Sequence, residues 1–342
     1  MKTYVVGDIH GCYDEFIKLS KKIGINEEDF VLSLGDIVDR GNKSVEVYKY
    51  FKKRENSQVL MGNHERKHLK GILSYSQEIV KVQFGNEYEE FTQWCESLPY
   101  YYETQEAIIV HAFFEHDVLL KNQKEEVLAG TTSGSTYLEK KYKENTFWQN
   151  YYLGDKPIIY GHHVVGESPI IENNTYGIDT GACHGGKLTI VELPGFKIHQ
   201  LQVKQDHWKE EQTKWQIPVL KAKKWESMKM DQIERKLKDL EYKEEPKITE
   251  YLNEVKIWVE KLKSTRLILK KKLEDLAKEL KQKLGVEFYK EVRNLSYSSF
   301  IYKADSNNLK LEDLEKILDT PEKIIKLGTE LSLLDVPNKK IS

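Results

Sequence analysis

Three glycine-framed stretches in the N-terminal part of the chain decide the fold: GDIHG at Gly7–Gly11, GDIVDRG at Gly35–Gly41 and GNHE at Gly62–Glu65. Each follows a short apolar run of strand-forming residues, so each is expected where a strand ends. VHA at Val110–Ala112 and YGHH at Tyr160–His163 repeat the arrangement further along the chain. Because ligands collect at the carboxyl ends of strands in α/β sheets, these five segments are predicted to deliver polar side chains to one crevice.

The residues around these stretches predict an α/β domain over residues 1–203. Short apolar, β-rich runs predict its strands. They lie at Thr3–Val6, Phe30–Leu34, Gln58–Met61, Ala107–Val110, Pro157–Tyr160, Thr175–Ile178, Lys187–Leu193 and Lys197–Val203. Helices are predicted between the early strands, at Tyr13–Lys22, Ser44–Arg54 and Tyr88–Ser97. The last two strands are expected to pair across Pro194-Gly195, and residues 113–150 to form helices or a cap over the crevice.

The composition changes near residue 204, after which Lys, Glu and Leu dominate and glycine nearly vanishes. Apolar residues spaced three and four apart from Leu252 to Leu280 predict a long amphipathic helix, with Arg266 as the single break in the pattern. Met230–Leu240 repeats this spacing upstream of Glu245-Pro246. An antiparallel helical hairpin is therefore predicted.

Residues 204–342 as a whole are predicted to form a helical domain, a coiled-coil-like hairpin followed by short helices. The long helix should end at Gly285, and the last helix should begin with Thr320 as N-cap and Pro321 at its first position. The apolar stripe is interpreted as the buried seam of an internal bundle. A coiled-coil dimer is the alternative, so the region could mediate self-association or partner binding.

The overall composition excludes several classes of protein. Of 342 residues, 39% are hydrophobic, which is enough to bury a core, and the formal net charge is −2. This charge argues against a general attraction to nucleic acid or to an anionic membrane. No run of about 18 apolar residues is present, and with the first motif at Gly7 no signal peptide is expected. Cys12, Cys95 and Cys183 show no CxxC spacing and are interpreted as reduced thiols, so a cytoplasmic protein is expected.

The polar side chains of the five segments form a set suited to metal ions. Asp8 and His10 stand two residues apart after a strand, so both can reach one metal, and the Asp36 carboxylate can bridge two cations. Carboxylate, amide and imidazole ligands suit Mn²⁺, Fe or Zn²⁺, and two Mn²⁺ ions are the preferred expectation. Two metals roughly 3.5–4 Å apart are a known arrangement for phosphoester hydrolysis. The candidate metal ligands are Asp8, His10, Asp36, Asn63, His111 and His162.

Three further residues complete a catalytic hypothesis. His64 could protonate the leaving-group oxygen, with Asp39 orienting its ring, and Arg40 offers two parallel donors to phosphate oxygens. His162 is favoured over its neighbour His163 because it directly follows a glycine. Five other histidines fit no motif and are interpreted as structural or surface residues: His68, His116, His184, His199 and His207.

GDIHG, GDIVDRG and GNHE, in this order and at these separations, resemble the calcineurin-like metallophosphoesterases over about residues 1–203. The nearer resemblance is to the branch of serine/threonine protein phosphatases and symmetrical diadenosine-tetraphosphate hydrolases. It implies a metallophosphoesterase β-sandwich flanked by helices. It also implies a division of roles. One metal would be held by Asp8, His10 and Asp36, and the other by Asp36, Asn63, His111 and His162. His64 and Asp39 would form the acid dyad, and Arg40 would grip phosphate.

The chain departs from this family pattern at two places. The family usually has glycine two residues after the fourth-motif histidine, where this chain has Phe113. A second phosphate-binding arginine normally follows a tryptophan shortly before the YGH motif, but residues 147–150 read Phe-Trp-Gln-Asn. Lys140, Lys141 or Lys143, or a group from the C-terminal region, could take its place. The IDTGA stretch matches bacterial members, and its Asp179 is interpreted as a supporting residue rather than a ligand.

The expected function is hydrolysis of phosphomonoesters by metal-activated water, in the manner of protein phosphatases. GDIVDRG and GNHE favour this reading, whereas GCYDE at Gly11–Glu15 resembles the dinucleoside-tetraphosphate hydrolases. A dinucleoside polyphosphate or another nucleotide is therefore the alternative substrate, and RNA or DNA phosphate ends are the third. A non-catalytic scaffold that assembles partners through its helical region is the hypothesis from another class.

Overall fold

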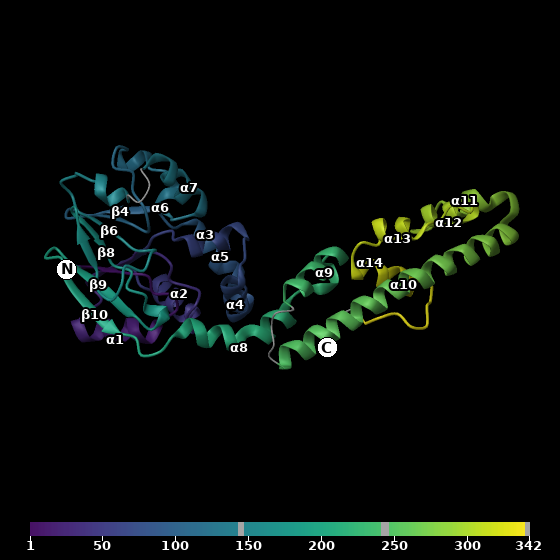
Figure 1. The fold of residues 1–342 in the computed structure, drawn as a ribbon, viewed down its shortest axis with the longest axis horizontal. Helices are drawn as coiled ribbons and strands as arrows, with labels where there is room; N and C mark the ends of the chain where they lie inside the picture. Colours follow the sequence, from purple (N-terminus) through teal and green to yellow (C-terminus); the bar gives the residue numbers. More distant parts are fainter. Residues whose placement is uncertain (143–146, 241–245, 339–342) are drawn as a thin grey trace. The chain divides into compact units, whose positions relative to one another are not determined.

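The computed structural model describes residues 1–142, 147–240 and 246–338 (Figure 1). The chain divides into two compact units, Met1–Trp215 and Gln216–Ser342. The composition change at residue 204 thus lies inside the first unit, shortly before the division between the units.

Among the described residues of the first unit, ten strands form two five-stranded sheets. The first sheet has the order β10-β9-β1-β2-β3, with bounds Lys197–Gln202, Lys187–Leu193, Thr3–Val6, Phe30–Ser33 and Ser57–Val59. The second has the order β4-β5-β6-β8-β7, with bounds Tyr101–Glu103, Ile108–Val110, Ile158–Tyr160, Thr175–Gly177 and Ile170–Glu172. All eight predicted strands are present, and β9 pairs antiparallel with β10 as the predicted hairpin.

Two short strands were not predicted from the sequence. β7 is exposed along its whole length, so its residues show no alternation of buried and exposed positions. β4 is a three-residue strand within a run of tyrosines, and it pairs antiparallel with β5. Both lie at the edges of the second sheet, where one side of the strand has no neighbour.

The two sheets pack face to face, and helices cover their outer faces. Val5 and Leu32 of the first sheet share a buried cluster with Ile109 and Ile159 of the second. Their neighbour Tyr4 points to the opposite face, because successive side chains alternate along a strand, and it packs with α1, α2, α4 and α5. These helices span Tyr13–Ile23, Ser44–Lys53, Tyr75–Phe84 and Tyr88–Glu96.

The second sheet is covered on its outer face by the segment that was expected to form helices or a cap. The helices α6 (Glu125–Leu128) and α7 (Thr132–Lys141) and the short helix η3 (Trp148–Tyr151) pack there with Val110 and Tyr160. Figure 1 shows α6 and α7 on the side of the unit away from α1. The predicted α/β fold, a β-sandwich flanked by helices, is confirmed.

The first turns of α8 (His207–Ala222) are tied to the first unit by buried polar contacts. His207 is 4% exposed, and its Nε2 lies 3.0 Å from Glu15 Oε1. Glu211 is 3% exposed and accepts hydrogen bonds from Gln83 Nε2 at 3.1 Å and from Trp215 Nε1 at 2.5 Å. Residues 204–215 therefore complete the first unit.

The described secondary structure of the second unit consists of helices. α9 spans Met230–Asp239, and α10 spans Pro246–Leu284 and ends directly before Gly285, as predicted. The helices that follow are α11 (Phe288–Val292), α12 (Ser298–Asp305), α13 (Leu311–Ile317) and α14 (Pro321–Glu330). α14 has Thr320 at its N-cap position and Pro321 at its start, also as predicted. The predicted C-terminal helical region is confirmed, although Glu245 of the predicted hairpin turn lies outside the described residues.

The apolar stripe of α10 is buried within its own unit. Val255, Leu262 and Leu269 belong to a core cluster that also includes Ile233 of α9 and Ile324 of α14. This burial favours the internal bundle over a coiled-coil dimer built on the same stripe.

Arg266, the break in the apolar pattern, has a structural reason. It is 7% exposed and donates from Nη2 to the backbone carbonyl of Leu318 at 2.6 Å. Leu318 is the C-cap of α13, and a helix C-terminus presents unpaired carbonyls that attract a cation. Arg266 thus joins α10 to α13 without leaving the seam.

Within the part of the chain that the structure describes, no helix is both long enough and apolar enough to cross a membrane.

We expect fragment 1–215 to be more stable than fragment 1–203. The shorter fragment lacks His207 and Glu211 and leaves Glu15 and Gln83 without their partners. Its melting temperature should be lower by roughly 2–8 °C, which corresponds to the loss of about 1–2 kcal/mol in a domain of this size. Thermal denaturation followed by circular dichroism measures the difference. His199→Ala in fragment 1–215 is the matched control, since it removes only the Glu192 contact on β10. Equal melting temperatures for the two fragments would contradict the expectation.

Candidate active site

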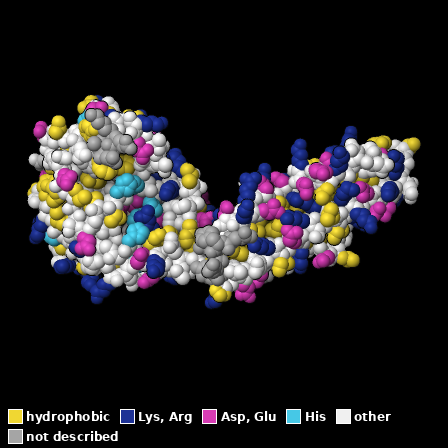
Figure 2. All heavy atoms as spheres, viewed as in Figure 1, with side chains coloured by type: hydrophobic (Ala, Val, Ile, Leu, Met, Phe, Trp, Pro, Cys, Tyr) yellow, Lys and Arg dark blue, Asp and Glu magenta, His cyan; other side chains and the backbone are white. Residues whose placement is uncertain are grey.

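The strand order brings the predicted site residues to one edge of the sandwich. β1, β2 and β3 are parallel neighbours, so the loops that follow them lie side by side. β5 and β6 of the second sheet are also parallel. Their following loops carry His111 and His162. Figure 2 shows histidine side chains gathered in the middle of this face of the first unit.

Five of these site residues have left-handed backbone conformations. They are His10 (φ 44°), Asp36 (φ 48°), Asp39 (φ 71°), Arg40 (φ 64°) and His162 (φ 71°). Such conformations cost about 1–3 kcal/mol each for residues other than glycine, and they persist only where neighbouring contacts hold them. Here the loops hold one another, since His10 N donates to Asp36 O at 2.8 Å and Gly161 N donates to His111 O at 2.8 Å.

Glu65 fixes the loop that carries Asp36. Its carboxylate is fully buried and accepts hydrogen bonds from the backbone of Asp36 at 2.8 Å and of Ile37 at 2.9 Å. Burial, together with the nearby charge of Asp36, raises the pKa of Glu65 to about 8, although the hydrogen bond from the Asp36 backbone lowers it. The glutamate of GNHE therefore holds the backbone of the Asp36 loop in place.

Close approach explains the glycine of GNHE. A Cβ on Gly62 would lie 2.3 Å from Asp36 Oδ1, a distance that no side chain tolerates. Gly161 has the same constraint, since its Cβ would lie 2.2 Å from Asp8 Oδ1. The sequence suggests that Gly62 permits a sharp turn, but the structure shows that it makes room for a carboxylate.

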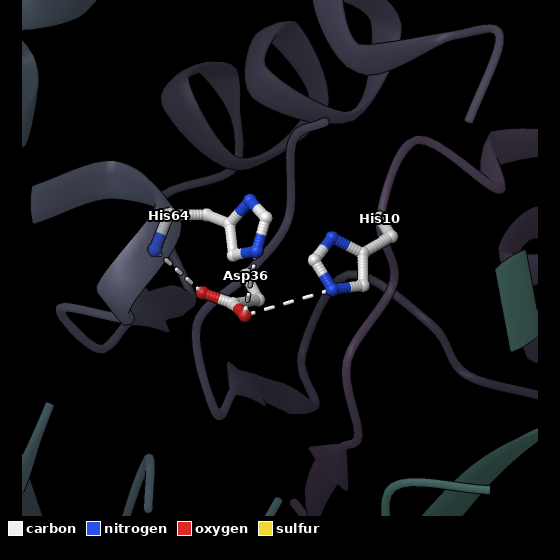
Figure 3. A group of neighbouring side chains, drawn as sticks. All are labelled: His10, Asp36 and His64. Atoms are coloured by element: carbon white, nitrogen blue, oxygen red, sulfur yellow. Dashed lines mark hydrogen bonds and ion pairs between the residues drawn. The ribbon is translucent and has the colours of Figure 1, made fainter. Parts of the chain in front are cut away.

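Asp36 lies at the centre of two groups of possible ligand atoms. In the first, Asp36 Oδ2 lies 3.6 Å from His10 Nε2 and 3.9 Å from His64 Nε2 (Figure 3). In the second, Asp36 Oδ1 lies 3.5 Å from His111 Nε2, and His162 belongs to the same group. A single carboxylate thus faces both groups, which is the arrangement expected of a bridging ligand.

Asn63 and Asp8 border these groups. Asn63 Oδ1 lies 3.2 Å from His111 Nε2 and 3.0 Å from His162 Nδ1. Asp8 is 3% exposed, and its carboxylate accepts from the backbone N of His162 at 3.1 Å. Burial, with Asp179 and Asp36 nearby, raises the pKa of Asp8 well above its usual range. A cation beside Asp8 would offset this cost. Asp179, whose Oδ1 accepts from Gly181 N at 3.0 Å, lies behind Asp8.

The tautomers and charges of the site fit metal ligation. His10 Nδ1 faces the carbonyl of Val38 at 2.8 Å, and His111 Nδ1 faces that of Leu34 at 3.1 Å. A carbonyl accepts, so each Nδ1 carries the proton and each Nε2 presents a lone pair towards Asp36. Burial lowers the pKa of His10 and His111, and it lowers that of His162 to about 2.

The Asp36 carboxylate is ionised although it is buried. Burial by itself would raise the pKa of Asp36, but the nearby His111, His64 and His10 outweigh it and lower the pKa. Neutral imidazole and ionised carboxylate are the forms that bind metals. The residues present therefore fit two divalent ions.

His64 is held by a chain of buried hydrogen bonds. His64 Nδ1 lies 2.5 Å from Asp39 Oδ2, and the other oxygen of Asp39 lies 3.0 Å from His68 Nε2. His68 Nδ1 in turn lies 2.9 Å from the Tyr88 hydroxyl, and Gln77 Nε2 donates to Asp39. Burial would raise the pKa of Asp39, but His68 and His64 lower it overall. Asp39 is thus an anion that orients His64 and leaves its Nε2 towards the centre.

His68 and Gln77 are parts of this site that the sequence reasoning missed. His68 fits no motif and was interpreted as structural or surface, yet it is 2% exposed and contacts the predicted Asp39. The available signal was its spacing: His64 and His68 stand four residues apart in α3 (Asn63–Lys70) and so share a helix face. Gln77 lies on α4 and had no local signal.

Arg40 lies among the imidazoles rather than at the surface. Its Nη1 is 3.1 Å from His10 Nε2, and its Nη2 is 3.1 Å from His64 Nε2. Of the lysines suggested as a second phosphate-binding group, Lys141 pairs with Glu115 at 2.8 Å and with Asp117. Lys140 is exposed, and Lys143 lies outside the described residues.

Comparison with known proteins agrees with this geometry. The family model described as calcineurin-like phosphoesterase matches residues 1–248. The chain belongs to this family. It is therefore a phosphoesterase and not the non-catalytic scaffold considered above. Such enzymes depend on two metal ions, and the two groups around Asp36 can bind metal.

Two relatives and one solved structure illustrate the likeness. A bis(5'-nucleosyl)-tetraphosphatase PrpE [asymmetrical] from Geobacillus sp. (strain WCH70) is 33% identical over 229 residues, covering 57% of this chain and 91% of the relative. The protein of the same name from Bacillus velezensis is 32% identical, covering 56% and 88%. A serine/threonine phosphatase structure from Saccharomyces cerevisiae aligns with a TM-score of 0.43 at 17% identity, covering 60% of this chain and 81% of that one.

We expect Asp36→Asn to remove activity and most bound metal, because this carboxylate faces both ligand groups. Asparagine tolerates the left-handed conformation and retains Oδ1, so the fold should persist. Metal content after dialysis, measured by mass spectrometry, gives the result. Asp14→Asn is the matched control, since Asp14 is exposed and forms its ion pair with Lys43. Two metals per chain in Asp36→Asn would contradict the bridging role.

We expect His64→Asn to lower turnover by roughly 10²–10⁴ while metal stays bound, because the variant removes the proton donor alone. His68→Asn should cause a smaller loss, since His68 acts through Asp39. Steady-state rates on a substrate with a poor leaving group measure both effects, with His199→Asn as a control. Unchanged turnover in His64→Asn on that substrate would rule out the acid role.

Proposed function

We propose that this phosphoesterase hydrolyses nucleotide polyphosphates, with a dinucleoside tetraphosphate as the preferred substrate. The observation that carries the proposal is the likeness to two bis(5'-nucleosyl)-tetraphosphatases, which extends over 91% and 88% of their lengths. This choice places the alternative substrate suggested by GCYDE ahead of the phosphomonoester expected from the other motifs.

The site would hold two divalent ions through the two ligand sets that the family resemblance implies, with His64 kept as the proton donor. Asp8, His10 and Asp36 form one set, and Asp36, Asn63, His111 and His162 form the other. We keep Mn²⁺ as the preferred ion, with Fe or Zn²⁺ as alternatives, because oxygen and imidazole ligands predominate. Bound ions would supply an activated water at neutral pH and offset the charge of the phosphate oxygens.

The residues of the chain supply positioning and a proton. The Arg40 guanidinium lies within reach of the space between His10 and His64, where it can bind two oxygens of one phosphate group. His64 presents Nε2 to the same space and can give its proton to the leaving oxygen. Asp39 holds the His64 ring and stabilises the protonated form before the transfer, and His68 holds Asp39.

Hydrolysis of phosphomonoesters, including phosphorylated protein, is the second candidate. It was suggested by the complete GDIVDRG and GNHE motifs, whose distinctive residues include Asp39 and Glu65. Asp39 contacts His64, and Glu65 contacts the Asp36 loop. Both act on the machinery of the site, so they bear on the reaction more than on the choice of substrate.

The test is a comparison of substrates with the full chain and added Mn²⁺. We expect diadenosine tetraphosphate to be cleaved with a higher kcat/KM than p-nitrophenyl phosphate or a phosphoserine peptide. The word asymmetrical in the relatives' name suggests unequal products, a nucleoside triphosphate and a monophosphate, which ion-exchange chromatography resolves. Chelation of the metal, or Asp36→Asn, should abolish the reaction. Rapid release of phosphate from the peptide, with the dinucleotide left intact, would favour the second candidate.

A further inference from the structure

A hollow of about 380 Å³ lies directly beside the second ligand group. Its wall includes the neighbours of two ligands, Ala112 after His111, and Gly161 and His163 on either side of His162. Its size lies within the range of about 300–1,000 Å³ typical of small-molecule sites. Figure 2 shows hydrophobic side chains next to the histidines on this face.

Both departures from the family pattern lie in the wall of this hollow. Phe113 stands where the family has glycine, and its ring centroid is 5.4 Å from that of His162 and 5.5 Å from that of His163. Gln149 follows Trp148, at the place where the family pattern has an arginine after the tryptophan, and both residues line the same hollow. Two changes that are distant in the sequence therefore alter one place next to the metal centre.

Aromatic and amide side chains dominate the wall of the hollow. Phe147, Trp148 and Val164 line the hollow with Phe113, and Glu172 is the single Lys, Arg, Asp or Glu side chain among its described lining residues. A wall with one carboxylate and no guanidinium or ammonium group disfavours a second phosphate. It suits a flat, uncharged group that stacks on an aromatic ring.

Two residues of the wall carry buried polar atoms whose hydrogen bonds are not made within the described residues. Trp148 Nε1 and Gln149 Oε1 are buried and have no hydrogen-bond partner among the described residues. Unpaired polar atoms of this kind are rare in folded proteins. One is a donor and the other an acceptor, and the Glu172 carboxylate is a further acceptor. A purine edge carries both ring-nitrogen acceptors and an amino or imino donor.

We propose that this hollow binds the purine base of the nucleotide substrate while a phosphate of the same molecule lies at the metal centre. The inference rests on the proposed nucleotide substrate and deepens it. Phe113 is then a specificity-determining residue that stacks on the base, and the loss of the second arginine is part of the same adaptation. The hollow then recognises the nucleoside part of the substrate, whereas the family pattern has a phosphate-binding arginine at this place.

The test compares a substrate that has a base with one that has none. Diadenosine tetraphosphate and inorganic tripolyphosphate both contain phosphoanhydride bonds, and only the first carries adenine. We expect Phe113→Gly to lower the ratio of their kcat/KM values by roughly tenfold or more, because it removes one stacking surface. Glycine is the residue that the family pattern carries here, so the fold should tolerate it, and thermal denaturation checks this.

Two further variants serve as controls for the loss of the Phe113 ring. Phe113→Trp retains an aromatic face and should keep the preference for the dinucleotide. Leu153→Ala is the matched control, since Leu153 is 93% exposed, lies near η3 and is not part of the wall. Adenosine should inhibit the natural chain competitively, and Phe113→Gly should lose this inhibition.

The outcomes separate the two levels of the hypothesis. If the natural chain cleaves the dinucleotide but Phe113→Gly leaves both the ratio and the adenosine inhibition unchanged, the pocket assignment is overturned and the proposed function stands. If the natural chain cleaves tripolyphosphate or p-nitrophenyl phosphate but no nucleotide, the proposed function is overturned and the pocket assignment with it. A selective loss of the dinucleotide reaction in Phe113→Gly, absent in Leu153→Ala, supports both.

Discussion

The buried Asp36 carboxylate is the constraint on which the rest of the site depends. A carboxylate that is 2% exposed is costly unless charges and donors surround it. Here the backbone of His64 donates to it at 3.0 Å, imidazoles from two other loops face it, and Glu65 fixes the loop from behind. Residue 62 is glycine because the Asp36 carboxylate occupies the space that a Cβ would fill. The position of the Asp36 side chain thus explains why Gly62 and Glu65 belong to the GNHE motif.

The sandwich makes that placing possible. Parallel neighbours β1, β2 and β3 end at one edge, and β5 and β6 of the second sheet contribute the remaining loops. Five left-handed residues in those loops store strain that inter-loop hydrogen bonds offset. A rigid double sheet therefore supports a centre that none of its loops could form alone.

The helical unit is held together mainly by the packing of apolar side chains. Its apolar stripe is buried among neighbouring helices, and the one charged residue in the stripe, Arg266, binds a helix C-terminus. An arginine inside a seam is tolerated when its guanidinium finds a carbonyl and its aliphatic part stays in the core. The apolar stripe of α10 is therefore covered by helices of its own unit.

The sequence by itself determined the eight predicted strands, the C-terminal end of α10, the start of α14 and the family, because local periodicity, helix-end residues and glycine-framed motifs are local signals. It also named nine candidate site residues, which the fold brings to one edge of the sandwich and whose catalytic roles await experiment. Only the tertiary structure decided that Glu65 supports Asp36, that His68 and Gln77 hold Asp39, and that Phe113 and Gln149 share one wall. These are contacts between residues on different elements, and no local pattern encodes which distant side chains will meet.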